Sequence, residues 1–189
     1  MGSYTTVSLD QKQFLKIINT IRKGYIGVDD VDHRPNHQVA DILVLEANLG
    51  CRIGDIISLR HSDVIYDGGR YRLNFTEQKT GKKRTFLVPK EVKDFMDGCC
   101  YGDDDRLFKV SEYAVWKVLR SVTAYLEMDN ISSHSFRKYA AQQLFSKSGH
   151  DIELVREWLQ HSSVKTTQVY LRRSDAQLEK AISENISLA

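Results

Sequence analysis

Residues 61–89 limit the possible folds of this chain most strongly, because they interrupt a helical pattern that runs on both sides of them. Their sequence, HSDVIYDGGRYRLNFTEQKTGKKRTFLVP, contains β-prone runs separated by turn residues. Asp67-Gly68-Gly69 has the chemistry of a tight hairpin turn, and Thr80-Gly81 begins a second reversal before Pro89 closes the last run. Two consecutive hairpins predict a small three-stranded antiparallel sheet.

Helical spacing dominates the rest of the chain. Ser8 followed by Gln11 predicts a capping box for a first helix, which Gly24 ends. Residues 24–38 form a polar loop, at the end of which Pro35-Asn36 begin a second helix that Gly50 stops. A short helix with Ile56, Ile57 and Leu59 precedes the sheet, and further helices are predicted over about residues 90–98, 111–127, 135–147, 151–160, 164–172 and 175–187. The predicted fold class is therefore α+β and mainly α-helical, with one small sheet near the middle.

Chain length and composition fit one globular domain. The chain has 189 residues, of which 41% are hydrophobic and 28% charged. No apolar run reaches the length of a membrane span, and the polar first residues do not form a secretory signal. The opening MGSYTT matches a myristoylation pattern, but we interpret residues 1–7 as a vector remnant or linker. Three cysteines without a CxxC pair argue against a disulfide framework or zinc ribbon, and favour a reducing cytoplasm.

Charge is unevenly distributed along the chain, although the net charge is only +2. Residues 70–93 contain eight cations and two acids, a local balance of +6, whereas residues 29–46 contain five acids and one arginine. A basic face opposite an acidic one is typical of a domain that binds a polyanion. A solvated hairpin with surface lysines explains the basic segment equally well.

Six polar side chains lie where the local pattern does not require them: Arg52, Lys79, His134, Arg137, His161 and Tyr170. Each one alone has a simpler explanation. Arg52 could pair with Asp55 at the surface, and Lys79 could be a solvated turn lysine. A single histidine or tyrosine is more often packed or capping than catalytic.

Together the six residues form a set that suits phosphodiester transfer. This reaction needs a nucleophile, donors to the non-bridging oxygens and an acid for the leaving oxygen. Two arginines provide planar forks for phosphate oxygens, two histidines add donors, and a turn lysine can reach a leaving oxygen. A tyrosine hydroxyl normally titrates near 10, but surrounding cations favour its charged form. The cations would replace a metal ion, and no Walker or GxGxxG motif occurs, so we expect no metal and no cofactor.

The ordered set of Arg, Lys, His-x-x-Arg, His and Tyr resembles the catalytic domain of the tyrosine recombinases, the phage integrase family. The resemblance is strongest to integrases of phages and conjugative transposons. The matching stretches are GCRIGDIISL, QKTGKKRTFLVP, SHSFRKYAA and WLQHSSVKTTQVYL, within residues 40–173. Type IB topoisomerases share the set, so a DNA-relaxing enzyme is one alternative. A non-enzymatic helical DNA-binding module is the other.

The resemblance implies a role for each residue. Arg52 and Arg137 would bind the scissile phosphate, to which His161 would donate a hydrogen bond. Lys79 would protonate the leaving 5′ oxygen, His134 would act as acid and base on the tyrosine proton, and Tyr170 would form the 3′-phosphotyrosine. Asp55 would make a supporting contact. The family usually has Gly before the last histidine, and here Gln160 takes that place.

The resemblance also implies partners and a domain organisation. The partner is double-stranded DNA, bound by a homo-oligomer that is a tetramer in synapsis; a monomer is the alternative for the isolated domain. The expected location is the bacterial cytoplasm and not a membrane. The expected catalytic domain covers residues 1–173, and a tail helix covers 174–189. This tail helix docks in cis or on a neighbouring protomer. The family's N-terminal core-binding domain is not expected in this chain. Expected DNA contacts are Lys82, Lys83, Arg84, Lys138, Arg172 and Arg173.

Two further features have simple interpretations. His33 and His37 have the spacing of a helical metal pair, but Pro35 between them favours a chance pair in a loop. Cys51 lies beside Arg52, yet a small buried cysteine is commoner than a nucleophile.

Overall fold

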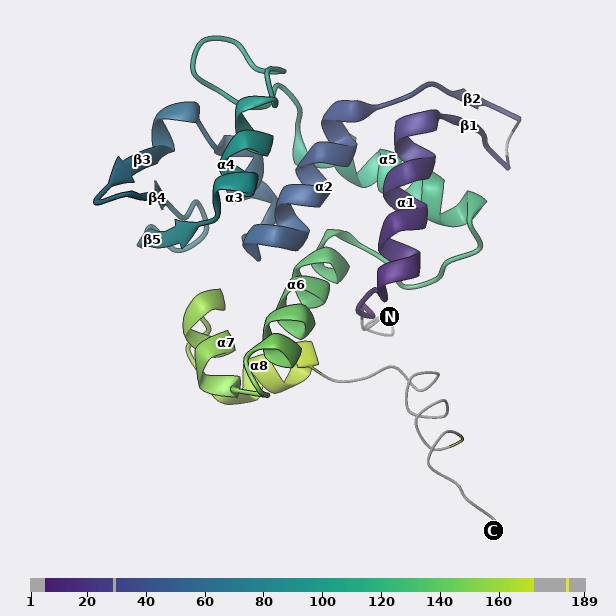
Figure 1. Ribbon diagram of the computed structural model, residues 1–189. Coiled ribbons are helices and arrows are strands. Elements are labelled where there is room, and N and C mark those ends of the chain that lie inside the picture. The colour runs from purple at the N-terminus through teal and green to yellow at the C-terminus, as the bar shows by residue number, and fades with distance from the viewer. Residues whose placement is uncertain (1–5, 29, 172–182, 184–189) are drawn as a thin grey trace.

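The computed structural model describes residues 6–28, 30–171 and Ser183 (Figure 1). The helices in this part of the chain are α1 (Gln11–Lys23), α2 (His37–Leu49), α3 (Ile53–Ser58), α4 (Lys90–Asp97), α5 (Glu112–Tyr125), α6 (Ser133–Lys147), α7 (Ile152–Leu159) and α8 (Val164–Leu171). The predicted class, mainly helical with a small sheet, is confirmed. The predicted tail helix, like Arg172 and Arg173, lies outside the described residues.

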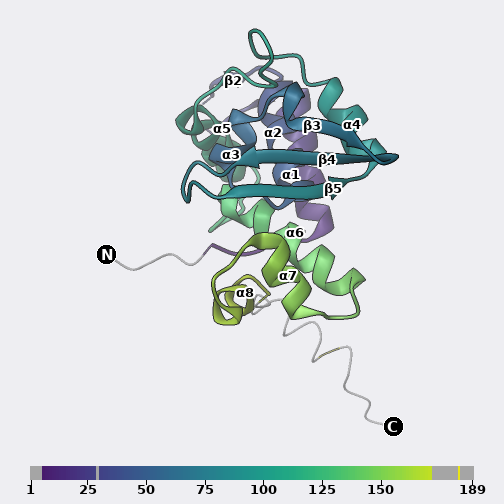
Figure 2. The same ribbon diagram turned by 90° about the vertical axis from the view of Figure 1, so that its left-hand side faces the viewer.

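The three-stranded sheet forms where the two turn signals predicted it. Strands β3 (Val64–Asp67), β4 (Arg70–Thr76) and β5 (Lys83–Val88) pair antiparallel in that order, after a single 3-10 turn over His61–Asp63. Gly68 and Gly69 both have positive φ, 56° and 83°, which a two-residue turn of this kind requires. Figure 2 shows the strands stacked one above another, with α1 and α2 behind them.

Helix α2 is the centre of the main core. It packs against α1, α3 and α6, and Figure 1 shows it between α1 and the sheet. Its apolar residues Ile42 and Leu43 have no exposed surface. The helix begins at the cap of Asn36 on the Val39 amide, as predicted, and ends at Gly50, whose φ is 57°. The chain therefore passes directly from the end of α2 to Arg52, which is the cap residue of α3.

A second, smaller core holds the last part of the described chain. Helices α7 and α8 pack against α6 and against each other (Figure 1). Ala141, Val155 and Leu159 are its buried centre. His161 follows α7 and Tyr170 lies near the end of α8, so this small core positions both of them.

The predicted capping box of the first helix is wrong by two residues. Asp10 is the cap: its carboxylate accepts from the Gln13 amide at 2.8 Å, and the Gln13 side chain accepts from the Asp10 amide at 3.0 Å. The sequence contains two overlapping capping patterns. The structure uses the second because Leu9, just before the cap, is 1% exposed and anchors the helix entry in the core.

The predicted polar loop contains a short ladder that sequence patterns did not show. Strands β1 (Tyr25–Ile26) and β2 (Asp32–His33) pair antiparallel. The His33 ring stacks on Tyr25 at a centroid distance of 4.6 Å, and its Nε2 lies 3.0 Å from the hydroxyl of Ser121. His33 thus has a packing role here, while His37 begins α2. Across the part of the chain that the structure describes, every helix is too short or too polar to cross a membrane.

Candidate active site

The six residues singled out from five separate stretches come together at one place. Arg52 caps α3, Lys79 lies on the β4–β5 turn, His134 and Arg137 lie on α6, His161 follows α7, and Tyr170 lies on α8. Burial lowers the pKa of His134, and the charges of Arg137, Lys138, Lys79 and Arg52 lower it further. Because one imidazole is influenced by residues from three elements, these cations share one electrostatic environment.

Arg137 is the buried centre of this cluster. Its side chain is 1% exposed, and its Nη2 donates to the Leu159 carbonyl oxygen at 2.8 Å. Its Nε and Nη1 have no hydrogen-bond partner among the described residues. Burial lowers the pKa of this guanidinium, and Tyr170 acts electrostatically in the opposite direction. A buried cation with unused donors is costly unless an anion pairs with it, so this arrangement favours an anionic ligand.

Arg52 is held by a carboxylate that sequence reasoning missed. Its Nη1 lies 2.8 Å from Oε2 of Glu77, and the Thr80 hydroxyl donates to the same oxygen at 2.7 Å. Burial raises the pKa of Glu77, but the hydrogen bonds from Thr80 and Arg52 and the charges of Arg52 and Arg84 lower it below the ordinary value overall. Glu77 therefore stays ionised and fixes Arg52 to the hairpin turn. Glu77 and Arg52 are 25 residues apart in sequence, and only the register of the hairpin brings the Glu77 carboxylate next to the Arg52 guanidinium.

Asp55 makes a contact between α3 and the same turn. Its Oδ1 accepts from the Gln78 amide at 2.8 Å, while Oδ2 lies 4.0 Å from Arg52 Nη1. The residue is 1% exposed. Asp55 therefore anchors the β4–β5 turn at Gln78. The next residue, Lys79, is exposed, so its side chain can extend away from the turn.

His161 is fixed in both orientation and protonation. Its Nδ1 lies 3.0 Å from the Thr167 hydroxyl on α8, which leaves Nε2 for another partner. Burial lowers its pKa to about 4, with contributions from Arg137, Arg52 and Arg84, so the ring is neutral at neutral pH. The preceding Gln160 adopts φ 54° and ψ 38°, a left-handed conformation that glycine adopts more readily. The departure from glycine costs on the order of 1 kcal/mol of strain and leaves His161 in place.

Tyr170 is held by ring contacts. Its ring meets the edge of His161 at 4.7 Å and an interplanar angle of 69°. The Lys138 ammonium lies 5.8 Å from its ring centroid. No described residue forms a hydrogen bond to its hydroxyl. The hydroxyl therefore remains available for chemistry.

Four of the six expected DNA contacts fall within the described residues, and two of these four are buried. Lys82 and Lys83 are exposed on the hairpin. Arg84, however, is 1% exposed and donates to the Trp158 carbonyl oxygen at 2.5 Å, with Glu77 Oε1 3.6 Å away. The alternation along β5 explains this, because Arg84 shares the inward face with Phe86 and Val88. The expectation that Arg84 directly contacts DNA is corrected to an internal brace between the hairpin and α7.

Lys138 is the second buried residue of this group. It is 5% exposed and donates through Nζ to the Thr6 carbonyl oxygen. Burial lowers its pKa. Its ammonium therefore faces the interior of the site, toward the Thr6 carbonyl and the Tyr170 ring.

The expected separation into basic and acidic faces is also weaker in three dimensions. Lys90 and Lys93 pair with Asp94 and Asp97 on their own helix. Glu46 is 1% exposed, and burial raises its pKa well above the ordinary value, opposed by Arg137 and reinforced by Glu112. Both charged segments therefore contain buried charged residues. The sequence did not show that Glu46 is one of them.

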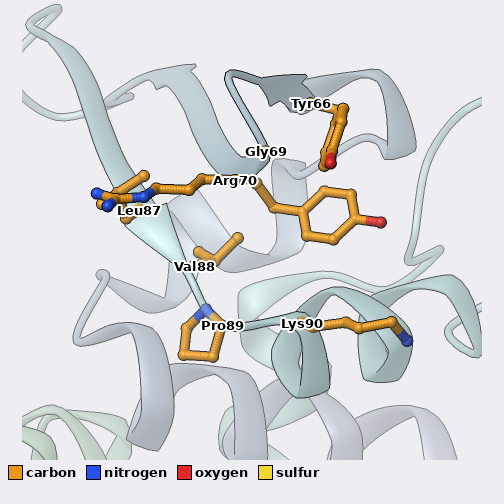
Figure 3. A pocket seen from close by; sticks show the side chains of 8 residues that line it. Tyr66, Gly69, Arg70, Leu87, Val88, Pro89 and Lys90 are labelled. Carbon is orange, nitrogen blue, oxygen red and sulfur yellow. The ribbon is translucent and has the colours of Figure 1, made fainter.

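The remaining features near the site have structural roles. Cys51 has no exposed surface, and burial raises the pKa of its thiol to about 11, which agrees with the packing interpretation. A cavity of about 610 Å³ lies on the far end of the sheet, lined by Tyr66, Arg70, Tyr71, Leu87, Val88 and Lys90 among others (Figure 3). It shares no residue with the six and is an open groove between the sheet and the start of α4.

Comparison with known proteins agrees with this geometry. The family model described as Phage integrase family matches residues 8–177. Tyrosine recombinase XerA of Pyrococcus furiosus is 26% identical over 163 residues, which cover 78% of this chain and 55% of that protein. Tyrosine recombinase XerC of Corynebacterium glutamicum is 28% identical over 159 residues, which cover 76% of this chain and 49% of that protein. The chain spans about half the length of the curated relatives it matches.

Solved structures share the fold. The catalytic domain of bacteriophage HP1 integrase superposes with a TM-score of 0.64 at 21% identity, and covers 95% of both chains. A lambda integrase dimer bound to a COC′ core site superposes with a TM-score of 0.69 at 18% identity, and covers 93% of this chain and 62% of that one.

Proposed function

This chain belongs to the phage integrase family, and we propose from that premise that it is the catalytic part of a tyrosine recombinase, which integrates or excises a mobile element by cleaving and rejoining double-stranded DNA. The observation that supports this most is the buried Arg137, which has two unused donors and interacts electrostatically with both Tyr170 and Arg52. An anion-binding centre next to a tyrosine with a free hydroxyl suits attack on a phosphodiester.

We propose a cleavage step in which each of these groups has one role. The Tyr170 oxygen attacks the scissile phosphorus, forms a phosphotyrosine ester and breaks the bond to the 5′ oxygen. His134 takes the tyrosine proton and Lys79 protonates the leaving oxygen. Arg52, Arg137 and His161 stabilise the charge on the non-bridging oxygens. Rejoining reverses these steps, so the phosphotyrosine ester conserves the bond energy and no ATP is needed.

Assembly on DNA belongs to the same proposal. The neighbouring structures include a lambda integrase dimer on a core site and the XerH recombinase bound to its difH substrate. We expect this chain to act as a homo-oligomer on double-stranded DNA, with a tetramer in synapsis. The experiment that tests the proposal is incubation with a nicked suicide substrate, from which a covalent protein–DNA product is expected. DNA binding without any such product would favour the non-enzymatic module.

Replacing Lys79 with Ala should slow cleavage about 100-fold or more, because general acid catalysis typically contributes that much. A substrate with a 5′-bridging sulfur should restore the rate, since its leaving group needs no proton. The measurement is covalent product formation over time with both substrates. Lys82→Ala, on the same exposed turn, is the matched control and should affect both substrates equally. A Lys79→Ala variant that the sulfur substrate does not rescue would argue against the general-acid role.

Cleavage should persist in excess EDTA, because two arginines, two histidines and a lysine provide the electrostatic stabilisation. Covalent product formation is measured with and without the chelator at constant ionic strength, because DNA binding itself depends steeply on salt. Activity that disappears with EDTA and returns with magnesium would instead place the protein among metal-dependent nucleases.

A further inference from the structure

We propose that Lys138 is a positioning residue for Tyr170, and that it couples the nucleophile to the chain segment at Thr6. The proposal deepens the function proposed above and rests on it for its activity measurements. It replaces the expectation that Lys138 contacts DNA.

Lys138 is placed between two partners that lie far from it in sequence. Its ammonium donates to the Thr6 carbonyl oxygen, 132 residues earlier, and lies 5.8 Å from the Tyr170 ring centroid. This distance is within the range of a cation–π contact. The side chain is 5% exposed, so the ammonium has little access to solvent.

The Thr6 carbonyl is fixed by its own surroundings. The next amide, that of Val7, donates to the Asn130 carbonyl oxygen at 3.1 Å. Asn130 has φ 59° in the turn before α6, and Leu9 is buried in the main core. The segment over residues 6–9 therefore lies against the start of α6, and Figure 2 shows this first part of the described chain running in beside that helix.

A buried ammonium needs partners, and Lys138 has few. Among the described residues, its one hydrogen-bond acceptor is the Thr6 carbonyl, and the Tyr170 ring lies within cation–π distance of it. If the Thr6 segment moved away, the flexible lysine stem could carry the charge toward water. The ring of Tyr170 would then lose the cation that holds it. The position of the segment and that of the nucleophile are therefore linked through one side chain.

Other charged groups lie around the same pair. Arg137 acts on Tyr170 from α6, His161 contacts its ring from the end of α7, and Lys138 also acts on His134. Lys138 differs from Arg137 and His161 because its hydrogen-bond acceptor, the Thr6 carbonyl, lies before α1. Removing the Lys138 charge should therefore free the Tyr170 ring from its link to this segment.

The test uses three lysine variants and two measurements. Lys138→Met keeps the apolar stem without the charge, Lys138→Arg keeps the charge, and Lys147→Met changes an exposed lysine on the same helix. The rate of covalent product formation on the nicked substrate is measured at neutral pH. The local stability of α8 is measured without DNA, by hydrogen exchange at the backbone amides around Tyr170. Thermal melting checks that each variant is folded.

We expect Lys138→Met to lower the rate at neutral pH roughly tenfold and to speed hydrogen exchange at the amides around Tyr170. Lys138→Arg should restore both, and Lys147→Met should match the parent chain. Deleting residues 1–6 removes the acceptor, so it should reproduce the Met effect, and combining the two changes should add little.

Two results would overturn the inference. One is a Lys138→Met variant with an unchanged cleavage rate and unchanged hydrogen exchange around Tyr170. The other is an Arg variant that fails as the Met variant does, because a role in packing alone would explain that. Absence of covalent product from the parent chain would contradict the proposed function instead, and the hydrogen exchange would still decide the role of Lys138.

Discussion

Replacing Tyr170 with Phe should reduce covalent attachment to DNA to below detection, while folding and DNA binding remain. The change removes a single oxygen, which no described residue uses as a hydrogen-bond partner. The ring contacts with His161 and Lys138 do not involve that oxygen, so α8 should keep its place on the small core. Covalent product on a nicked suicide substrate is measured on a denaturing gel, beside a gel shift for binding and a thermal melt for folding.

Tyr66→Phe is the matched control for this experiment. Tyr66 is 67% exposed at the far end of the sheet, outside the candidate site, and loses the same oxygen. Its variant should form the covalent product at the rate of the parent chain. If Tyr170→Phe still gave a product of the same size, a different residue would be the nucleophile and the proposed mechanism would fail.

Replacing Glu77 with Gln should destabilise the domain by about 3 kcal/mol and also slow cleavage. The carboxylate is 1% exposed and is the counter-charge of Arg52 and of the buried Arg84. Removing one member of a buried ionic group leaves the other charges uncompensated. Arg52 would also lose the contact that holds it at the site, so the cleavage rate should fall together with stability. Urea unfolding at neutral pH measures the first effect, and covalent product formation the second.

The pH dependence gives this prediction a second measurement. The folded-state pKa of Glu77 lies below its ordinary value, so its contribution to stability is present at neutral pH. The contribution is lost as pH falls through the folded pKa, because the unfolded chain then binds more protons. Glu77→Gln should therefore lose less stability on acidification than the parent chain. Asp67→Asn, which removes the exposed partner of Arg72, is the control and should change the unfolding free energy by less than about 1 kcal/mol. An equally small change for Glu77→Gln would show that the buried pairing is not needed.

Local patterns predicted most of the fold because the relevant interactions are local. The hairpin turn at Gly68-Gly69 and the cap at Asn36 depend on residues within a few positions, and both form as predicted. Where two local patterns overlapped, the core decided: Leu9 is buried, so Asp10 and not Ser8 caps α1. The β1–β2 ladder was missed because two-residue strands are too short for alternation to be visible.

The candidate site divides in a similar way. The sequence alone identified the six residues that the structure brings into one electrostatic cluster, because their order and spacing resemble one family and their chemistry suits one reaction. It also predicted that Tyr170 needs surrounding cations. It did not show which charged residues face inward.

Tertiary structure decided the roles of Glu77, Arg84 and Lys138. In the sequence, these are an acid and two cations in strongly charged or polar stretches, and all three are buried in the folded chain. Their partners, Arg52, the Trp158 carbonyl and the Thr6 carbonyl, are 25, 74 and 132 residues away. A helix or strand pattern fixes which residues share a face, over a distance of a few residues. A buried charge needs a partner, because an unpaired charge in the interior is costly. The packing of whole elements determines which distant group becomes that partner.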